Sequence, residues 1–276
     1  MTLTEALILG VVQGLTEPLP VSSSAHLVLV PALVPGFQPP GVAFDVLLHL
    51  GTLLSVVFFL RREIGELLAS LMPGKGPAVP APGTDAGEKA ANRRMVLWLM
   101  VATFLTGIIG ILFKDRIERL FESVEITACM LFITGILLFG SDRVKTNGRL
   151  KGNMNLKDAI VLGLVQAVAL IPGISRSGST ISFGIFRGLE RETSARFSFL
   201  LSIPAIGGAA ILKSADLLRL GTGDLPVLGA GFIAAAITGF LSLKLLFVMI
   251  NKIGLAPFAW YCWLVGSATL IVRSMG

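Results

Sequence analysis

Long apolar runs separated by short polar segments make up most of the chain. A helix needs about 20 predominantly apolar residues to cross the hydrocarbon core of a bilayer. The runs that meet or approach this length are 41–60, 95–113, 124–140, 197–212, 225–243 and 253–272. Because every backbone polar group in lipid must be paired within the chain, we expect these runs to be helical. The pattern predicts an all-α polytopic membrane protein with six transmembrane helices.

Two further apolar segments are too interrupted to span a bilayer. In the first half, an apolar stretch ends at Glu17 and is followed by Pro18, Pro20 and the serine run 22–24. Proline disfavours a helical conformation at the residue before it, and a serine can cap the helix that follows. The second half shows the same kind of break around Pro172. We therefore expect two re-entrant helical hairpins, each covered by protein or facing a water-filled cavity.

The two interrupted segments are related in sequence. Residues 5–24 read EALILGVVQGLTEPLPVSSS, and residues 158–177, which lie 153 positions later, read DAIVLGLVQAVALIPGISRS. This register predicts a single membrane domain, residues 1–276, built from a first repeat over 1–153 and a second repeat over 154–276. Each repeat would hold one hairpin and three spans. Since three is an odd number of crossings, the second repeat would have inverted topology.

The composition agrees with a membrane protein. Apolar residues make up 54% of the chain and charged residues 14%, with a mean hydropathy of +0.82, whereas soluble domains carry roughly 25% charged residues. The loops on one predicted side hold 15 Lys and Arg residues and those on the other side hold six. Because basic loops face the cytoplasm, the net charge of +6 reflects topology and does not indicate a nucleic-acid partner. We expect the loops 61–94 and 141–157 inside, both termini outside, and the first hairpin entering from outside.

The break in the first hairpin carries the strongest candidates for chemistry. Glu17 is a carboxylate in an apolar segment, where ionisable groups are costly and usually functional, although it can also serve as a solvated cap. Ser22, Ser23 and Ser24 fall where the second short helix begins, and a helix N-terminus suits a phosphate. We expect Ser22 and Ser24 to contact that phosphate. His26 lies three residues after Ser23 on the same helical face, where it can act as base or acid toward that hydroxyl.

The second hairpin differs from the first in its polar residues. Arg176 holds the position that Ser23 holds in the first repeat, and Leu170 replaces Glu17. A guanidinium offers a planar fork for phosphate oxygens, and small neighbours let backbone N–H groups approach an anion. The neighbours that we expect to line this anion site are Gly173, Ser175, Ser177 and Thr180. The repeat therefore predicts a division of labour, with the acid and hydroxyl on one hairpin and the guanidinium on the other.

Two alternatives remain open at this point. Asp45 and His49 lie four residues apart in the first span, and they either line the site or pair with each other. Inverted repeats with broken helices are also typical of secondary transporters, so a carrier or flippase for a phosphorylated lipid or anion is the main alternative to an enzyme. The asymmetry between the two hairpins favours a reaction centre.

The two breaks also carry a family signature. The stretch from Gln13 to His26, QGLTEPLPVSSSAH, resembles the E/Q-x-x-x-E and serine-rich motif of the bacterial undecaprenyl pyrophosphate phosphatases, the bacitracin-resistance family. The stretch from Pro172 to Thr180, PGISRSGST, is similar to that family's second motif, PGxSRSxxT. The resemblance covers essentially the whole chain.

This resemblance implies an enzyme of the bacterial cytoplasmic membrane that hydrolyses a polyprenyl pyrophosphate lipid to the monophosphate and phosphate, with Mg²⁺ or Ca²⁺ as cofactor. The reaction recycles the lipid carrier of cell-wall synthesis, and we expect the site to face the outer side. The functional positions that the resemblance implies are Gln13, Glu17, Ser23, His26 and Arg176, with Glu17 and Gln13 as ligands of the cation. Gln13 departs from the glutamate common in the family and offers a neutral oxygen only. The sequence leaves open whether Ser23, His26 or water attacks, and whether the protein forms a homodimer.

Overall fold

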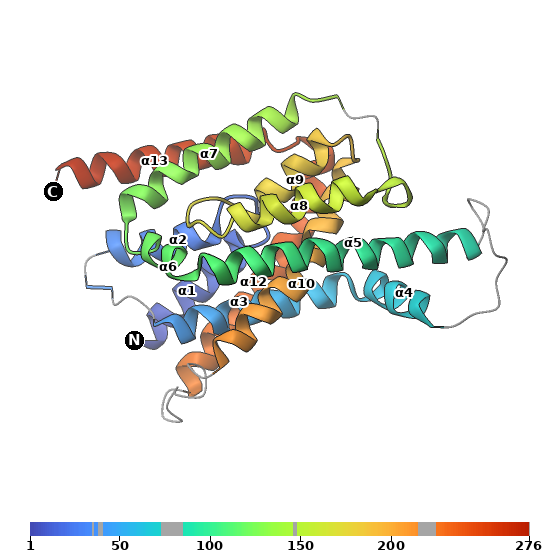
Figure 1. Cartoon of the computed structure of the whole chain (residues 1–276). Helices are drawn as coiled ribbons and strands as arrows, with labels where there is room; N and C mark the ends of the chain where they lie inside the picture. Colours follow the sequence, from blue (N-terminus) through green and yellow to red (C-terminus); the bar gives the residue numbers. More distant parts are fainter. Residues whose placement is uncertain (35, 38–40, 73–84, 146–147, 215–224, 276) are drawn as a thin grey trace.

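The protein is helical throughout the part that the computed structural model describes, which is residues 1–275 without 35, 38–40, 73–84, 146–147 and 215–224 (Figure 1). No strand occurs in these ranges; Arg149 and Leu189 form an isolated β-bridge. The helices are α1 (Leu3–Thr16), α2 (Ser23–Leu33), α3 (Val42–Phe59), α4 (Arg61–Leu71), α5 (Asp85–Leu112), α6 (Lys114–Leu120), α7 (Val124–Asp142), the 3₁₀ helix η1 (Lys151–Asn153), α8 (Leu156–Val168), α9 (Arg176–Phe186), α10 (Arg191–Leu212), α12 (Leu225–Lys252) and α13 (Ala256–Met275).

Helices occupy all six of the predicted apolar runs, namely α3, α5, α7, α10, α12 and α13. Among the described residues, α5, α7, α10 and α12 are long and apolar enough to cross a membrane. Helices α3 and α4, bent by 73° at the break between them, make a fifth candidate. The last helix, α13, carries two tryptophans and a tyrosine and is not among these candidates. The fold is thus that of a multi-pass membrane protein, and the sixth span stays a prediction.

The two predicted helix breaks are present. Helix α1 ends at Thr16 and α2 begins at Ser23, while α8 ends at Val168 and α9 begins at Arg176. Both second helices begin with a serine cap, as expected. The Ser22 Oγ accepts the Ala25 N–H at 3.4 Å in α2, and the Ser175 Oγ accepts the Gly178 N–H at 3.0 Å in α9. The course of these segments relative to the bilayer stays a prediction.

The first helix of each half packs on a long helix of the other half. Helix α1 lies against α12, and α8 lies against α5 (Figure 1). Small residues make these contacts close, because lipid offers helices no hydrophobic drive to associate and packing must supply it. A Cβ atom on Gly14 would lie 2.7 Å from the Ala235 carbonyl oxygen, and one on Gly163 would lie 2.8 Å from that of Ala102. This crossed packing brings the two helix breaks toward each other.

Candidate active site

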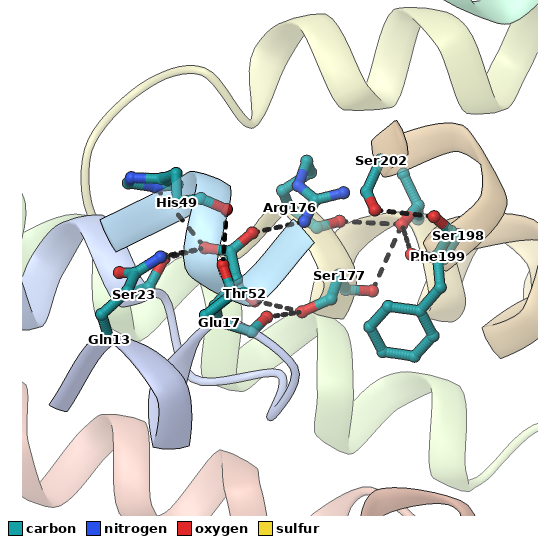
Figure 2. A network of polar contacts seen from close by, with 12 residues as sticks. Gln13, Glu17, Ser23, His49, Thr52, Arg176, Ser177, Ser198, Phe199 and Ser202 are labelled. Atoms are coloured by element: carbon teal, nitrogen blue, oxygen red, sulfur yellow. Dashed lines mark hydrogen bonds and ion pairs between the residues drawn. The ribbon is translucent and has the colours of Figure 1, made fainter. Parts of the chain in front are cut away.

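The two breaks meet through one ion pair. Arg176 is the first residue of α9, and its Nη2 donates to the Glu17 Oε1 at 2.5 Å (Figure 2). Backbone contact accompanies the pair, because a Cβ atom on Gly178 would lie 3.1 Å from the Pro20 carbonyl oxygen. Glu17 and Arg176 are 159 positions apart in the chain, so the site exists only when both halves are folded together.

The Glu17 carboxylate is the centre of this cluster. Its Oε2 accepts hydrogen bonds from the Ser23 hydroxyl and, at 3.3 Å, from the Gln13 amide nitrogen (Figure 2). All three side chains are buried, with Glu17 only 8% exposed. The structure therefore brings together the acid, the hydroxyl and the amide that the first motif predicted, and it adds the predicted guanidinium from the second motif.

Helix α3 carries Asp45 and His49, for which the sequence left two alternatives open. The His49 Nε2 lies 3.6 Å from the Glu17 Oε2, and the His49 Nδ1 donates to the Asp45 backbone carbonyl at 2.8 Å. The Thr52 hydroxyl donates to the His49 carbonyl at 2.9 Å. Of the two alternatives for His49, the ring lines the site, and its contact with Asp45 is to the backbone. The sequence signal was the placing of polar residues at 45, 49 and 52 on one face of an apolar helix.

The second break is held by a residue that the sequence did not single out. The Thr134 hydroxyl, from α7, donates to the Gly173 carbonyl at 2.9 Å and accepts the Ser175 N–H at 2.9 Å. One side chain thus satisfies two backbone groups of a buried irregular segment, and such groups are costly when they are buried without a partner. Thr134 fixes the backbone directly before Arg176.

Gly173 supports a prediction about stability. It has a φ of +93°, and a Cβ atom placed there would lie 2.6 Å from the Met130 Cβ. Both the conformation and the contact exclude a side chain, so Gly173→Ala should destabilise the protein by about 2 kcal/mol or more. The measurement is thermal unfolding in detergent, with Gly208→Ala as control. Gly208 has open space around it in α10, and its substitution should leave the melting temperature unchanged or raised; equal melting temperatures for the two variants would contradict the prediction.

The other predicted substrate contacts lie around the same junction. The Ser177 hydroxyl is 3.5 Å from the Glu17 carbonyl and 3.3 Å from the Ser175 Oγ. The Ser22 and Ser24 hydroxyls are 3.1 Å apart at the start of α2. Thr180 is placed differently, because its hydroxyl bonds to the Arg176 carbonyl at 2.8 Å and to the Ser198 hydroxyl at 2.5 Å. Its contacts tie the first turn of α9 to α10.

His26 is buried, but its contacts differ from those that the helical spacing suggested. Its Nδ1 lies 2.8 Å from the Ser22 carbonyl oxygen, and its Nε2 lies 2.8 Å from the Tyr261 hydroxyl. The Ser23 hydroxyl, toward which His26 was expected to act, donates to Glu17. Nothing in the sequence pattern indicates that Tyr261 of α13 lies beside α2.

Two buried polar atoms of the site, the Gln13 Oε1 and the Arg176 Nη1, have no hydrogen-bond partner within the described ranges. Buried polar atoms are normally paired, so unpaired ones in a cluster indicate a place for a ligand. A guanidinium N–H suits a phosphate oxygen, and an amide oxygen suits a hard cation.

The Gln13 oxygen and the Glu17 carboxylate fit the divalent cation that the family resemblance implies. Within the described ranges, no group of three or more His, Cys, Asp or Glu side chains could hold a metal ion. Mg²⁺ is commonly bound by one or two carboxylates and completes its shell with water and substrate phosphates. One carboxylate, Glu17, beside the unpaired Gln13 oxygen matches that smaller ligand set.

Fold and site together define a multi-pass helical membrane protein with a buried acid, hydroxyl and guanidinium where two helix breaks meet. Comparison with known proteins gives the family. The model of the family described as bacitracin resistance protein BacA matches residues 6–268, and the chain belongs to this family. Similar proteins include the undecaprenyl-diphosphatases of Syntrophotalea carbinolica, 41% identical over 99% of this chain and 100% of the relative, of Gemmatimonas aurantiaca, 43% identical over 99% and 100%, and of Methanobrevibacter smithii, 40% identical over 96% of each.

Proposed function

We propose that this protein is an integral membrane phosphatase that hydrolyses undecaprenyl pyrophosphate to undecaprenyl phosphate and inorganic phosphate. The observation that carries the proposal is the Glu17–Arg176 ion pair with the Ser23 hydroxyl on the same carboxylate. It supplies an anion-binding group, a proton acceptor and a nucleophile at one point. The relatives named undecaprenyl-diphosphatase, which match nearly the full length of the chain, supply the substrate.

In our proposal Arg176 binds the phosphate. One of its terminal nitrogens pairs with Glu17, and the other, Nη1, is buried and has no partner in the described structure. A pyrophosphate oxygen satisfies Nη1 directly and competes with Glu17 for the guanidinium. Substrate binding would therefore weaken the ion pair and leave the Glu17 carboxylate better able to accept a proton.

In our proposal the Ser23 hydroxyl is the attacking group. Its hydroxyl donates to the Glu17 Oε2, so the proton has an acceptor before the reaction starts. The serine oxygen forms a bond to the terminal phosphorus, the bond to the bridging oxygen breaks, undecaprenyl phosphate leaves, and the proton passes to Glu17. Water then cleaves the phosphoserine. Glu17 returns the proton to the serine oxygen, and phosphate leaves with the oxygen of that water.

Glu17 and Gln13 would hold the divalent cation together with the substrate phosphates. Its chemistry would be to neutralise charge on the pyrophosphate, which carries more negative charge than Arg176 alone can balance. The unpaired Gln13 oxygen beside the carboxylate supports this assignment.

The setting that we propose is the bacterial cytoplasmic membrane, with two inverted repeats, six spans and the site open to the outer side. The matching positions of the two helix breaks support the repeat, since α1 and α8 begin at Leu3 and Leu156, and α2 and α9 begin at Ser23 and Arg176, both 153 residues apart. The excess of basic residues in the loops 61–94 and 141–157 supports the orientation.

The test is phosphate release by the purified protein from undecaprenyl pyrophosphate in detergent micelles. We expect turnover with Mg²⁺ or Ca²⁺, loss of turnover with a chelator, and recovery when the cation is restored in excess. Ser23→Ala is the matched variant, since it removes one hydroxyl and should reduce release to the background rate. If the wild-type protein binds the lipid but releases no phosphate with any cation, the proposed phosphatase activity is overturned. If it is fully active in the presence of chelator, only the proposed requirement for a cation is overturned.

A further inference from the structure

The backbone at Ser22 is held in an uncommon conformation. Ser22 has a φ of 67° and is the one non-glycine residue with a positive φ in the described ranges. It caps α2, so its conformation sets the direction in which Ser23, the next residue, presents its hydroxyl. Non-glycine residues keep such conformations only where the surrounding structure fixes them, and these sites are often functional.

His26 holds Ser22 in this conformation. Its Nδ1 lies 2.8 Å from the Ser22 carbonyl oxygen. A carbonyl can only accept a hydrogen bond, so Nδ1 carries the proton and, in the neutral ring, Nε2 is left as an acceptor. The hydroxyl that reaches Nε2 is that of Tyr261, at 2.8 Å. In this tautomer, which the Ser22 carbonyl sets, the Tyr261 hydroxyl donates to Nε2 and holds the ring in the orientation in which Nδ1 meets Ser22.

Tyr261 reaches His26 from the far end of the chain. It lies on α13, 235 positions from His26, and the two rings are stacked with an interplanar angle of 11° and centroids 5.6 Å apart. Both ring nitrogens of His26 are thus engaged, one by the Ser22 carbonyl and the other by Tyr261. The Ser23 hydroxyl is bonded to Glu17. His26 therefore contacts the Ser22 turn and α13, while the Ser23 hydroxyl donates its hydrogen bond to Glu17.

We propose that Tyr261 and His26 act as a positioning pair that fixes the Ser22 turn and thereby aims the Ser23 hydroxyl at Glu17. In this role His26 neither removes nor supplies a proton in the reaction, and Tyr261 acts through His26 without touching the lipid. The inference rests on the proposed phosphatase activity, because its effect is measured on turnover.

Substituting His26 by asparagine or by glutamine distinguishes a positioning role of this residue from a role in acid–base chemistry. The asparagine Nδ2, like the histidine Nδ1, is bonded to Cγ, so His26→Asn keeps the donor to the Ser22 carbonyl. His26→Gln places its amide nitrogen near the position of Nε2 and loses that donor. We expect His26→Asn to retain kcat within roughly tenfold of wild type, since one uncharged hydrogen bond is lost, and His26→Gln to fall to the level of His26→Ala.

The tyrosine is tested by removing only its hydroxyl. We expect Tyr261→Phe to lower kcat roughly three- to tenfold with KM unchanged, the effect of one neutral hydrogen bond. In the His26→Asn background the same substitution should change kcat less than about twofold, because its partner atom is already gone. Trp260→Phe is the control, an aromatic substitution at the neighbouring, 61% exposed position of α13, and it should leave kcat unchanged.

The outcomes separate the inference from the function on which it rests. Wild-type protein without phosphate release would refute the phosphatase proposal. With an active wild type, the inference is overturned if His26→Asn is as inactive as His26→Gln, or if Tyr261→Phe turns over at the wild-type rate. Should His26→Asn fail to fold, as judged by gel filtration in detergent, the kcat of the near-isosteric Tyr261→Phe still decides between the two outcomes.

Discussion

Replacing Glu17 by glutamine should lower kcat for phosphate release by roughly 10²- to 10⁴-fold, the usual contribution of a positioned acid–base group. The substitution keeps the size of the side chain but removes three functions at once. It removes the acceptor for the Ser23 proton, the charge that pairs with Arg176, and the single carboxylate of the proposed cation site. The measurement is kcat as a function of cation concentration.

Gln13→Ala is the matched variant for Glu17→Gln. It removes the unpaired amide oxygen next to the carboxylate but leaves the carboxylate itself. We expect it to need more cation for half-maximal activity and to recover most of its kcat when the cation is saturating. If Glu17→Gln turned over at the wild-type rate with little cation, neither the ligand nor the base assignment of Glu17 would stand.

Arg176→Lys should remain severely impaired although it keeps the positive charge. Lysine offers a point charge where arginine offers a planar fork that can bond to Glu17 and to phosphate together. A charge-assisted hydrogen bond contributes about 1.5–3 kcal/mol, so losing the one from Nη1 should lower kcat roughly 10- to 150-fold before any misalignment. Arg176→Ala should be lower still. Turnover and KM of both variants are the measurements.

The control for Arg176→Lys is Arg187→Lys at the end of α9. Arg187 donates from Nε to Asp158 at 2.9 Å, outside the site, and lysine can keep that ion pair. Arg187→Lys should therefore show near wild-type kcat. If the Arg176 variants kept kcat and only KM rose, Arg176 would dock the lipid and would have no part in stabilising the charge that develops during the reaction.

The positions of the helix breaks could be read from the sequence because local chemistry determines them. Pro18 follows the end of α1, and Pro172 and Gly173 precede α9. Ser22 and Ser175 cap the helices that follow. The side chains of the Glu17 centre that come from these breaks were also predictable, since the two motifs carry them. The repeat predicted the acid on one hairpin and the guanidinium on the other, and the packing of the helices brings Glu17 and Arg176 into contact.

Residues from other helices could not be assigned in the same way. His49, Thr134 and Tyr261 each lie in a helix whose residues are mostly apolar, and only packing decides which of them faces the site. In a membrane protein the lipid-facing and protein-facing sides of a helix are both apolar, so hydropathy does not separate them as it does in a soluble protein. For the same reason the sequence did not predict that His26 contacts Tyr261 instead of the Ser23 hydroxyl, because Tyr261 comes from the opposite end of the chain.

The packing of α1 on α12 has a consequence for biosynthesis. Helix α1 ends at Thr16 and α12 begins at Leu225, so the ribosome adds about 200 residues between them. At typical rates of about 5–20 residues per second this takes roughly 10–40 s. During that interval the glycine face of α1, including Gly10 and Gly14, lacks its partner on α12, and Glu17 lacks Arg176 until residue 176 has been made. We therefore expect the nascent first half to depend on an insertase or chaperone that shields this segment until the last third of the chain has been made.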